Sequence, residues 1–330
     1  MAVLVTGGAG YIGSHMVWAL LDAGEDVVVL DRLSTGFEWA VAPEAKLVVG
    51  DIADADLVGS LIEEHSVDSI IHFAGSIVVP ESVSDPLGYY ENNTCKTRAL
   101  LAAAVKGGVK HVIFSSTAAV YGAAGLEPVK ETASLAPESP YGTSKLMTEL
   151  MLRDAAAAHG FTYTALRYFN VAGADPKGRT GQSTPGATHL IKVASETALG
   201  KRQSLTVFGE DYPTPDGTCV RDYIHVSDLA AAHLLALKRL RAGGGNLVAN
   251  CGYNHGYSVL EVIDAVKRVF GGDINVQMGP RRPGDAAAVV ADSSVARAEL
   301  GWVPQHDDLD RIVGDALAWE KSLSRRNSAR

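Results

Sequence analysis

The chain contains 330 residues, of which 47% are hydrophobic and 20% charged, and its formal net charge is −9 at pH 7. These values are typical of a globular protein and exclude a disordered or collagen-like chain, and the length favours about two domains. The acidic balance offers no electrostatic attraction for nucleic acid or an anionic membrane, and no stretch reaches the roughly 18 apolar residues of a membrane span.

Short apolar runs alternate with segments of helical periodicity over the first half of the chain. The first run, residues 2–5, leads into a helical pattern through Ile12 and Met16. Further strands are expected at residues 27–30, 46–49, 69–73, 110–115 and 162–167, and helices at 57–62, 86–105 and 141–158. The strands are apolar throughout rather than alternating, which is typical of a parallel sheet covered on both faces. The sequence therefore predicts an α/β fold with a Rossmann-type, doubly wound parallel sheet.

The pattern becomes less regular after Asn170. Residues 174–188 are rich in Gly, Pro and Thr and are expected to form an ordered loop or lid. Later helices are expected at residues 226–240, 258–270 and 309–319, and residues 247–251 are expected to add a strand to the main sheet. We therefore expect a first domain of residues 1–168 and a smaller, partly discontinuous α/β domain of residues 169–330, with part of 226–256 returning to the first.

A glycine-rich loop follows the first predicted strand and opens the first predicted helix. Gly7, Gly10 and Gly13 have the spacing G-x-x-G-x-x-G in the segment GGAGYIG. Such a loop turns tightly, brings backbone without a Cβ beside a pyrophosphate, and directs the free N–H groups of a helix N-terminus at the anion. Asp31 ends the second predicted strand, where a carboxylate bonds a ribose 2′-hydroxyl and repels a 2′-phosphate. The sequence therefore predicts a dinucleotide site that prefers NAD to NADP, a preference that the adjacent Arg32 weakens.

Two further groups of residues lie at the ends of predicted strands. Asp51 and Ile52 follow the third strand, in a position to meet an adenine. Phe73, Ala74 and Gly75 follow the fourth strand, with small residues where backbone would pass close to a cofactor. Because an open α/β sheet binds its ligand outside the carboxyl ends of its strands, we expect both groups to line one site.

Tyr141 and Lys145 are four residues apart near the start of a predicted helix, so both side chains lie on one face. A free tyrosine, with a pKa of about 10, is a poor base, but a neighbouring ammonium lowers that pKa. Such a pair can take a proton from a sugar hydroxyl while a nicotinamide takes the hydride. Upstream, Thr117 in the segment SSTAAVYG is positioned to relay that proton. A Tyr-x-x-x-Lys spacing by itself occurs more often on an ordinary surface helix. Here it follows a dinucleotide-binding loop in the sequence, and that context favours a catalytic role.

The chain resembles the extended short-chain dehydrogenase/reductase superfamily and, within it, the UDP-glucose (UDP-galactose) 4-epimerases. The resemblance extends through the segments VLVTGGAGYIGSH, IHFAG, PLGYYENN, FSSTAAVYG, SPYGTSK, LRYFNVAG, GTCVRDYIHVSDLA and RRPGDAAAVVAD. It implies an isomerase of galactose metabolism that inverts C4 of a UDP-hexose through a 4-keto intermediate. In that reaction a hydride passes to a retained NAD, the ketose turns in the pocket, and the hydride returns to its other face.

The resemblance also implies roles for individual residues. Tyr141 would be the base and acid, Lys145 its pKa partner and a contact of the nicotinamide ribose, and Thr117 the hydroxyl relay. The NAD site that it implies, mainly in the first domain, comprises Gly7, Gly10, Tyr11, Ile12, Gly13, Asp31, Asp51, Ile52, Phe73, Ala74, Gly75, Asn92, Ser115, Tyr141, Lys145 and Phe169. The UDP-sugar site, mainly in the second domain, comprises Thr117, Asn170, His189, Leu190, Phe208, Arg221, Arg282, Asp285 and Val289. No metal is implied.

Several positions depart from the pattern of these relatives. Thr117 stands where several have serine, so the hydroxyl is retained. Ala119 replaces a hydroxyl residue that can touch the sugar, and Val289 occupies a pocket-wall position that is tyrosine or cysteine elsewhere. Both changes leave room at the sugar and favour N-acetylated substrates. Ile77 stands where one branch has a lysine that contacts the cofactor, and His189 stands where an asparagine often meets the diphosphate.

Alternative functions stay open at this point. A 4,6-dehydratase would carry an acid directly after the hydroxyl residue, whereas Ala118 and Ala119 follow Thr117 here. A 4-epimerase of a UDP-N-acetylhexosamine, UDP-pentose or UDP-uronate differs only in a few pocket residues. A non-catalytic NAD-binding scaffold would be expected to lack Tyr141 or Lys145, and both are present.

The expected partners are a UDP-sugar and a second copy of the chain, with no nucleic acid and no membrane. Relatives commonly form dimers through two long helices of the first domain, here residues 86–105 and 141–158. The three cysteines, Cys95, Cys219 and Cys251, contain no CxxC pair. They predict reduced thiols in a cytoplasmic protein rather than a zinc site or disulfide framework.

Overall fold

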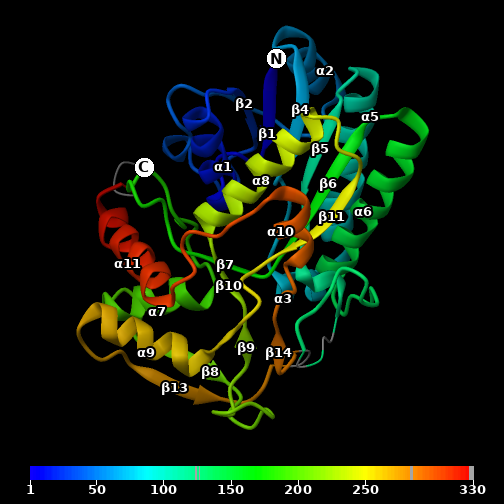
Figure 1. The fold of residues 1–330 in the computed structure, drawn as a ribbon. Coiled ribbons are helices and arrows are strands. Elements are labelled where there is room, and N and C mark those ends of the chain that lie inside the picture. Colours follow the sequence, from blue (N-terminus) through cyan, green and yellow to red (C-terminus); the bar gives the residue numbers. More distant parts are fainter. Residues whose placement is uncertain (123–124, 126, 283–284, 327–330) are drawn as a thin grey trace.

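A sheet of seven parallel strands, in the order β11-β6-β5-β4-β1-β2-β3, forms the centre of the molecule (Figure 1). This computed structural model describes residues 1–122, 125, 127–282 and 285–326. The strands are β1 (Ala2–Thr6), β2 (Asp26–Asp31), β3 (Lys46–Val49), β4 (Val67–His72), β5 (His111–Ser115), β6 (Thr162–Tyr168) and β11 (Leu247–Cys251). Every residue of β1 and β4 is buried, as expected for inner strands of a parallel sheet that is covered on both faces. The predicted α/β fold with a doubly wound parallel sheet is therefore confirmed.

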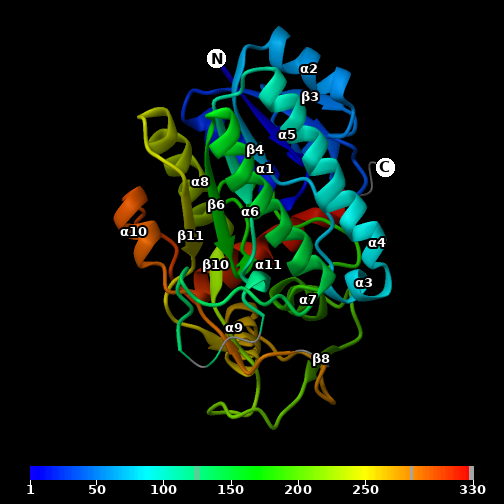
Figure 2. The same ribbon diagram turned by 90° about the vertical axis from the view of Figure 1, so that its right-hand side faces the viewer.

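Helices pack on both faces of this sheet (Figures 1 and 2). They are α1 (Tyr11–Asp22), α2 (Ala55–Glu64), α5 (Lys96–Lys106), α6 (Pro140–His159) and α8 (Val226–Arg241). Alternate residues of β1 point to opposite faces, so Val3 and Val5 join one core cluster with α1 and α8, and Leu4 joins another with α2 and α5. A third cluster packs α6 against β5 and β6.

The second half of the chain forms a smaller and less regular layer below the carboxyl ends of the main strands (Figure 1). Its helices are α7 (Leu190–Ala198), α9 (Val259–Phe270) and α11 (Leu309–Arg326). Helix α10 (Ser294–Leu300) instead packs beside α8 and β11 of the main sheet. Its short strands pair as β7 (Asn170–Ala172) with β10 (Tyr223–His225), β8 (Leu205–Phe208) with β13 (Val276–Gly279), and β9 (Val220–Arg221) with both β12 (Tyr257–Ser258) and β14 (Ala288–Val289). Within the described part of the chain, no helix is long and apolar enough to cross a membrane.

Two expected features of the second half are present. The strand predicted at residues 247–251 is β11, which pairs in parallel with β6 at one edge of the main sheet. The predicted ordered loop at residues 174–188 is fastened to α1, because Arg179 bonds both Asp22 and Asp175 and lies 4.5 Å from the ring of Trp18.

The helix predicted at residues 86–105 is present, and it contains a π-helical turn. It consists of α4 (Pro86–Tyr89), a π-helical turn (Tyr90–Cys95) and α5, and it is preceded by a short helix, α3 (Val79–Ser84). In the π-helical turn, Asn93 accepts a hydrogen bond from the Ser76 N–H and donates to the Ser144 hydroxyl. A wider turn that presents a side chain in this way is typical of functional sites, and residue spacing alone does not reveal it. Helix α7 is a further element that the sequence pattern does not predict.

Candidate active site

The glycine loop between β1 and α1 has the geometry of an anion cradle. Gly7 has a φ of +73°, and a Cβ added there would lie 2.6 Å from the Ala74 nitrogen. A Cβ on Gly13 would lie 2.1 Å from the Gly7 carbonyl oxygen. Gly10 is the N-cap of α1 and, among the described residues, the helix has no side-chain cap. The first-turn N–H groups of α1, which begins at Tyr11, are therefore available to an anion.

Asp31 lies at the end of β2, beside this loop. Its Oδ2 accepts a hydrogen bond from the Ala9 N–H over 2.9 Å, and its Oδ1 accepts one from the Leu33 N–H over 2.8 Å. An ionised carboxylate has about four acceptor positions, so these bonds fix its direction and leave capacity for ribose hydroxyls.

Asp51 follows β3 and has two cationic neighbours. The sequence predicts a contact of Asp51 with an adenine and no ion pair. Asp51 Oδ2 lies 2.5 Å from the Lys96 ammonium and 3.4 Å from Arg32. Burial opposes ionisation, but the Lys96 hydrogen bond and the nearby positive charges hold the pKa of Asp51 below its ordinary value. Arg32 also donates to Asn92, so these polar groups form one cluster at the edge of the site. The predicted neighbour Ile52 instead packs its side chain in the core.

The end of β4 brings the glycine loop and α6 together. Ala74 lies against Gly7, and a Cβ on Gly75 would lie 3.0 Å from Asn93 Oδ1 and 3.7 Å from the Lys145 nitrogen. Phe73 packs its ring against His233, with 4.9 Å between centroids. The residues predicted at this strand end therefore lie between the dinucleotide cradle and the Tyr-Lys pair.

Lys145 lies inside the protein, with 3% of its surface exposed. Its ammonium donates to the Ser115 carbonyl oxygen over 3.0 Å and lies 5.0 Å from the centroid of Phe114. Burial lowers the pKa of Lys145 to about 8. The Ser115 hydroxyl is hydrogen-bonded to that of Tyr168, which holds the end of β5 against β6.

Tyr141 lies one turn before Lys145 on α6, which begins at Pro140 and is capped by Ser139. Burial raises the pKa of Tyr141, and the Thr117 side chain lowers it through a hydrogen bond. The net shift is upward, whereas the sequence predicts a pKa lowered by Lys145. Desolvation of the phenolate is the reason, since it outweighs the other effects in this structure.

Thr117 forms the N-cap of a single 3₁₀ turn, Ala118–Val120, and accepts a hydrogen bond from the Ala119 N–H. The start of α6 packs tightly on this turn, because a Cβ on Gly142 would lie 2.5 Å from the Ala119 carbonyl oxygen. The absence of a Cβ at that position lets Tyr141 approach Thr117.

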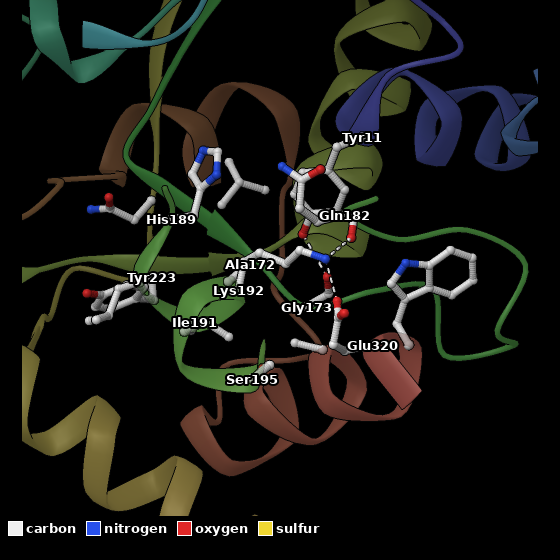
Figure 3. A pocket seen from close by; sticks show the side chains of 15 residues that line it. Tyr11, Ala172, Gly173, Gln182, His189, Ile191, Lys192, Ser195, Tyr223 and Glu320 are labelled. Carbon is white, nitrogen blue, oxygen red and sulfur yellow. Dashed lines mark hydrogen bonds and ion pairs between the residues drawn. The ribbon is translucent and has the colours of Figure 1, made fainter. Parts of the chain in front are cut away.

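A pocket lies between the glycine loop and the second half of the chain (Figure 3). Its lining includes Tyr11 and three predicted substrate residues, Asn170, His189 and Leu190. The Lys192 ammonium points between the Gln182 carbonyl oxygen and the Glu320 carboxylate (Figure 3).

The remaining predicted substrate residues come together in pairs. Arg221 Nη2 lies 3.9 Å from Asp285 Oδ1, and the Arg282 guanidinium lies 3.8 Å from the centroid of Phe208. Phe169 and Val289 pack against one apolar cluster, which contains Ala118, Val120, Tyr121 and Val129. Val289 therefore lies near the Thr117 turn although the two are far apart in sequence.

Other polar residues of the site are absent from the sequence prediction. They are Lys96, which pairs with Asp51, Asn93, which bonds Ser76 and Ser144, and the buried pair Glu149 and Arg167. Tyr141, Lys145 and Glu149 succeed one another at intervals of four residues. This spacing places Glu149 on the same helix face and could have identified it from the sequence.

Comparison with known proteins decides the family. A model described as the NAD dependent epimerase/dehydratase family matches residues 3–252. The chain belongs to this family. The UDP-glucose 4-epimerase of Azospirillum brasilense is 58% identical over 321 residues, which are 97% of this chain and 92% of that one.

Solved structures of related epimerases share the whole fold. The UDP-glucose 4-epimerase of Bifidobacterium longum in complex with NAD⁺ and UDP has a TM-score of 0.93 at 41% identity and covers 98% of both chains. The UDP-Glc/GlcNAc 4-epimerase of Campylobacter jejuni has a TM-score of 0.85 at 47% identity, covering 97% of this chain and 99% of that one.

Proposed function

We propose that the protein interconverts UDP-galactose and UDP-glucose by redox-neutral inversion at C4, with NAD as its cofactor. The observation that carries the proposal is the meeting of Thr117, Tyr141 and Lys145 beside a glycine cradle. The full-length similarity to UDP-glucose 4-epimerases supports the same reaction.

The glycine loop and the end of β2 fit NAD. Glycine is required at Gly7 and Gly13 because a Cβ would collide with backbone, and the unprotected N-terminus of α1 suits a pyrophosphate. Asp31 would take the adenosine ribose hydroxyls, and Gly75 leaves space beside Lys145 for the nicotinamide end. The chemistry supplied by bound NAD is acceptance of a hydride from C4 and its return to the opposite face.

Tyr141 would take the proton of the 4-hydroxyl, with Thr117 as relay, and return it after the ketose has turned. Because burial raises the pKa of Tyr141, its action as a base requires positive charge nearby. Lys145, with a pKa of about 8, would supply part of it from the same face of α6.

The UDP portion would bind among the arginines and aromatic residues of the second half. Arg221 and Arg282 are suited to a diphosphate, and Asp285 can accept from ribose hydroxyls. Firm binding of the part that does not react leaves the hexose free to turn. The remaining members of this set are Asn170, His189, Leu190 and Phe208. The proposal thus assigns NAD mainly to the first domain, which is residues 1–168 with part of 226–256, and the UDP-sugar mainly to residues 169–330.

A second candidate is activity on the N-acetylated sugars. Val289 and Phe169 pack on the same apolar cluster near the Thr117 turn, and Ala119 has a small side chain. Both features leave volume where an N-acetyl group would lie, and the Campylobacter jejuni relative is described as a UDP-Glc/GlcNAc epimerase. UDP-pentoses and UDP-uronates are further substrates to test.

The protein would act as a cytoplasmic homodimer. Apolar side chains are exposed on α3, α4 and α6, which lie side by side in Figure 2. Val83 is 65% exposed, Leu87 77%, Met147 40% and Leu150 41%. A neighbouring group of exposed apolar residues of this size is typical of an interface between subunits. This surface includes the two helical segments that the sequence predicts for dimerisation.

The deciding experiment uses purified protein, UDP-galactose and no added cofactor. Formation of UDP-glucose, together with NAD released on denaturation, would support the proposal. Bound NAD without conversion would redirect the search to a panel of N-acetylated, pentose and uronate UDP-sugars. Absence of both would contradict an enzymatic role.

A further inference from the structure

A buried ion pair lies beside the proposed catalytic group. Glu149 of α6 and Arg167 of β6 have side chains that are only 6% and 4% exposed. Arg167 donates from Nε to Glu149 Oε1 over 2.9 Å and from Nη2 to Oε2 over 2.5 Å. This two-pronged contact fixes the direction of both side chains, because the guanidinium and the carboxylate are planar.

One end of the Thr117 turn is bonded to this pair. Ser116 donates a hydrogen bond from its hydroxyl to Glu149 Oε1, and Ser116 directly precedes Thr117. Glu149 follows Lys145 by four residues and Tyr141 by eight, along one side of α6. The helix that carries the proposed base therefore also holds the segment that carries its relay.

The other end of the turn is bonded to the same pair. Tyr121 follows the 3₁₀ turn, and its hydroxyl accepts a hydrogen bond from Arg167 Nη1 over 2.9 Å. The same hydroxyl donates to Asn250 Oδ1 over 2.6 Å, and the Arg167 guanidinium lies 5.0 Å from the ring of Tyr121. Both ends of the Thr117 turn are thus fixed to one rigid group.

This hydrogen-bonded network is better suited to fixing the positions of side chains than to stabilising the fold. A buried ion pair adds little net stability compared with apolar residues of similar volume, because both charges lose their hydration. Fully bonded polar networks in a low-dielectric interior instead restrict geometry. Proton transfer between Thr117 and Tyr141 depends on such geometry, since a small displacement lengthens the hydrogen bond.

We propose that the Glu149–Arg167 pair is a positioning device that sets the approach of the Thr117 hydroxyl to the Tyr141 phenol. It acts through Ser116 and Tyr121 at the two ends of the turn. The inference rests on the proposed function and adds to it four residues that lie outside the proposed substrate and cofactor sets. It requires that loosening the turn slows the chemical step and leaves ligand binding unchanged.

The test uses Ser116→Ala and Tyr121→Phe, which each remove one hydroxyl and retain the ion pair. Each variant is expected to lower kcat about tenfold, leave KM for UDP-galactose within about twofold, and retain wild-type NAD content. The pH at which kcat reaches half its maximum should rise, because Thr117 no longer stabilises the Tyr141 phenolate as well.

A double-mutant cycle with Thr117→Val isolates the route of the effect. If the network acts through Thr117, Ser116→Ala lowers kcat by less than about twofold in the Thr117→Val background. Control variants are Ser69→Ala, which removes a buried hydroxyl of β4 with no partner among the described residues, and Tyr163→Phe in β6. Both controls should keep wild-type kcat.

Two results would overturn the inference while wild-type conversion is normal. One is an unchanged kcat and pH profile in Ser116→Ala and Tyr121→Phe. The other is a fall in kcat on Ser116→Ala that is as large in the Thr117→Val background as in the wild-type protein. Wild-type protein that retains NAD but converts no UDP-sugar would instead refute the proposed function, and the positioning role with it.

Discussion

The Tyr11 hydroxyl donates a hydrogen bond to the Gly173 carbonyl oxygen over 2.7 Å, although the residues are 162 positions apart in the chain. This bond joins the first turn of α1, beside the glycine cradle, to the segment that follows β7. The proposed NAD and UDP-sugar sites are therefore joined by a direct hydrogen bond from a side chain to the backbone.

Removing that hydroxyl tests the connection. Tyr11→Phe leaves a buried carbonyl oxygen without its donor and is expected to lower the free energy of unfolding by about 1–2 kcal/mol. Because the bond is adjacent to the cradle, the amount of NAD that co-purifies should fall as well. Thermal unfolding and NAD content measure both effects, with Tyr163→Phe as the matched tyrosine control. Wild-type values for both quantities would show that the bond is dispensable.

The role of Tyr141 predicts a specific separation of binding from chemistry. Tyr141→Phe keeps the ring and removes the acidic hydroxyl, so kcat is expected to fall by about 10²–10⁴-fold. NAD content and the affinity for UDP should stay unchanged, because other residues provide those contacts. Initial rates, NAD assay and UDP titration measure these quantities. A variant that keeps more than a tenth of the wild-type kcat would exclude Tyr141 as the base.

Val289 predicts a change in substrate range. Val289→Tyr fills the space beside Phe169 and is expected to lower kcat/KM for UDP-N-acetylglucosamine by about tenfold or more. The value for UDP-galactose should change by less than about threefold, because that sugar has no N-acetyl group. Parallel assays of the two substrates measure the ratio, and Val289→Ile serves as a conservative control. An unchanged ratio would mean that another residue sets the size limit.

Buried histidines make stability dependent on pH. His233 is fully buried, its Nδ1 bonds the Leu229 carbonyl oxygen, and its Nε2 has no partner in the part of the chain that is described. Burial lowers the pKa of His233 to about 4. An unfolded chain takes up this proton near pH 6.5, so the unfolded state binds more protons between pH 6.5 and 4 and stability falls as the pH falls through that window.

Replacing His233 should reduce this acid sensitivity. The residue accounts for roughly 3 kcal/mol of stability lost between pH 6.5 and pH 4, a loss that His233→Leu would not show. Denaturant unfolding at several pH values measures the difference between the variant and wild type. Parallel stability–pH curves for the two proteins would disprove the contribution.

Local spacing predicts the parts of the site that lie within one element. The glycine loop is one strand-to-helix turn, and Tyr141 and Lys145 are one helical turn apart. The spatial proximity of the residues within each feature therefore follows from their spacing in the sequence. The Lys96–Asp51 and Glu149–Arg167 pairs join different elements, and only the packing of those elements places one side chain beside the other.

Burial governs two site residues in ways that spacing along the chain does not predict. The Tyr141 pKa is raised, because desolvation depends on what surrounds the ring rather than on the residue four positions away. Ile52 contributes its side chain to the core, where an apolar residue at a strand end gains most from burial. The π-helical turn likewise serves a distant contact, that of Asn93 with Ser144.

The pairing of β11 with β6 has a consequence for synthesis on the ribosome. Until residue 251 has left the exit tunnel, β6 is the outermost strand of an incomplete sheet and exposes its unpaired backbone groups. The nascent chain is therefore open to edge-to-edge association while the 83 residues that follow β6, up to the end of β11, are translated. A fragment that ends at Tyr168 would expose that edge permanently. The pairing of β11 with β6 therefore also protects the first half of the chain from aggregation.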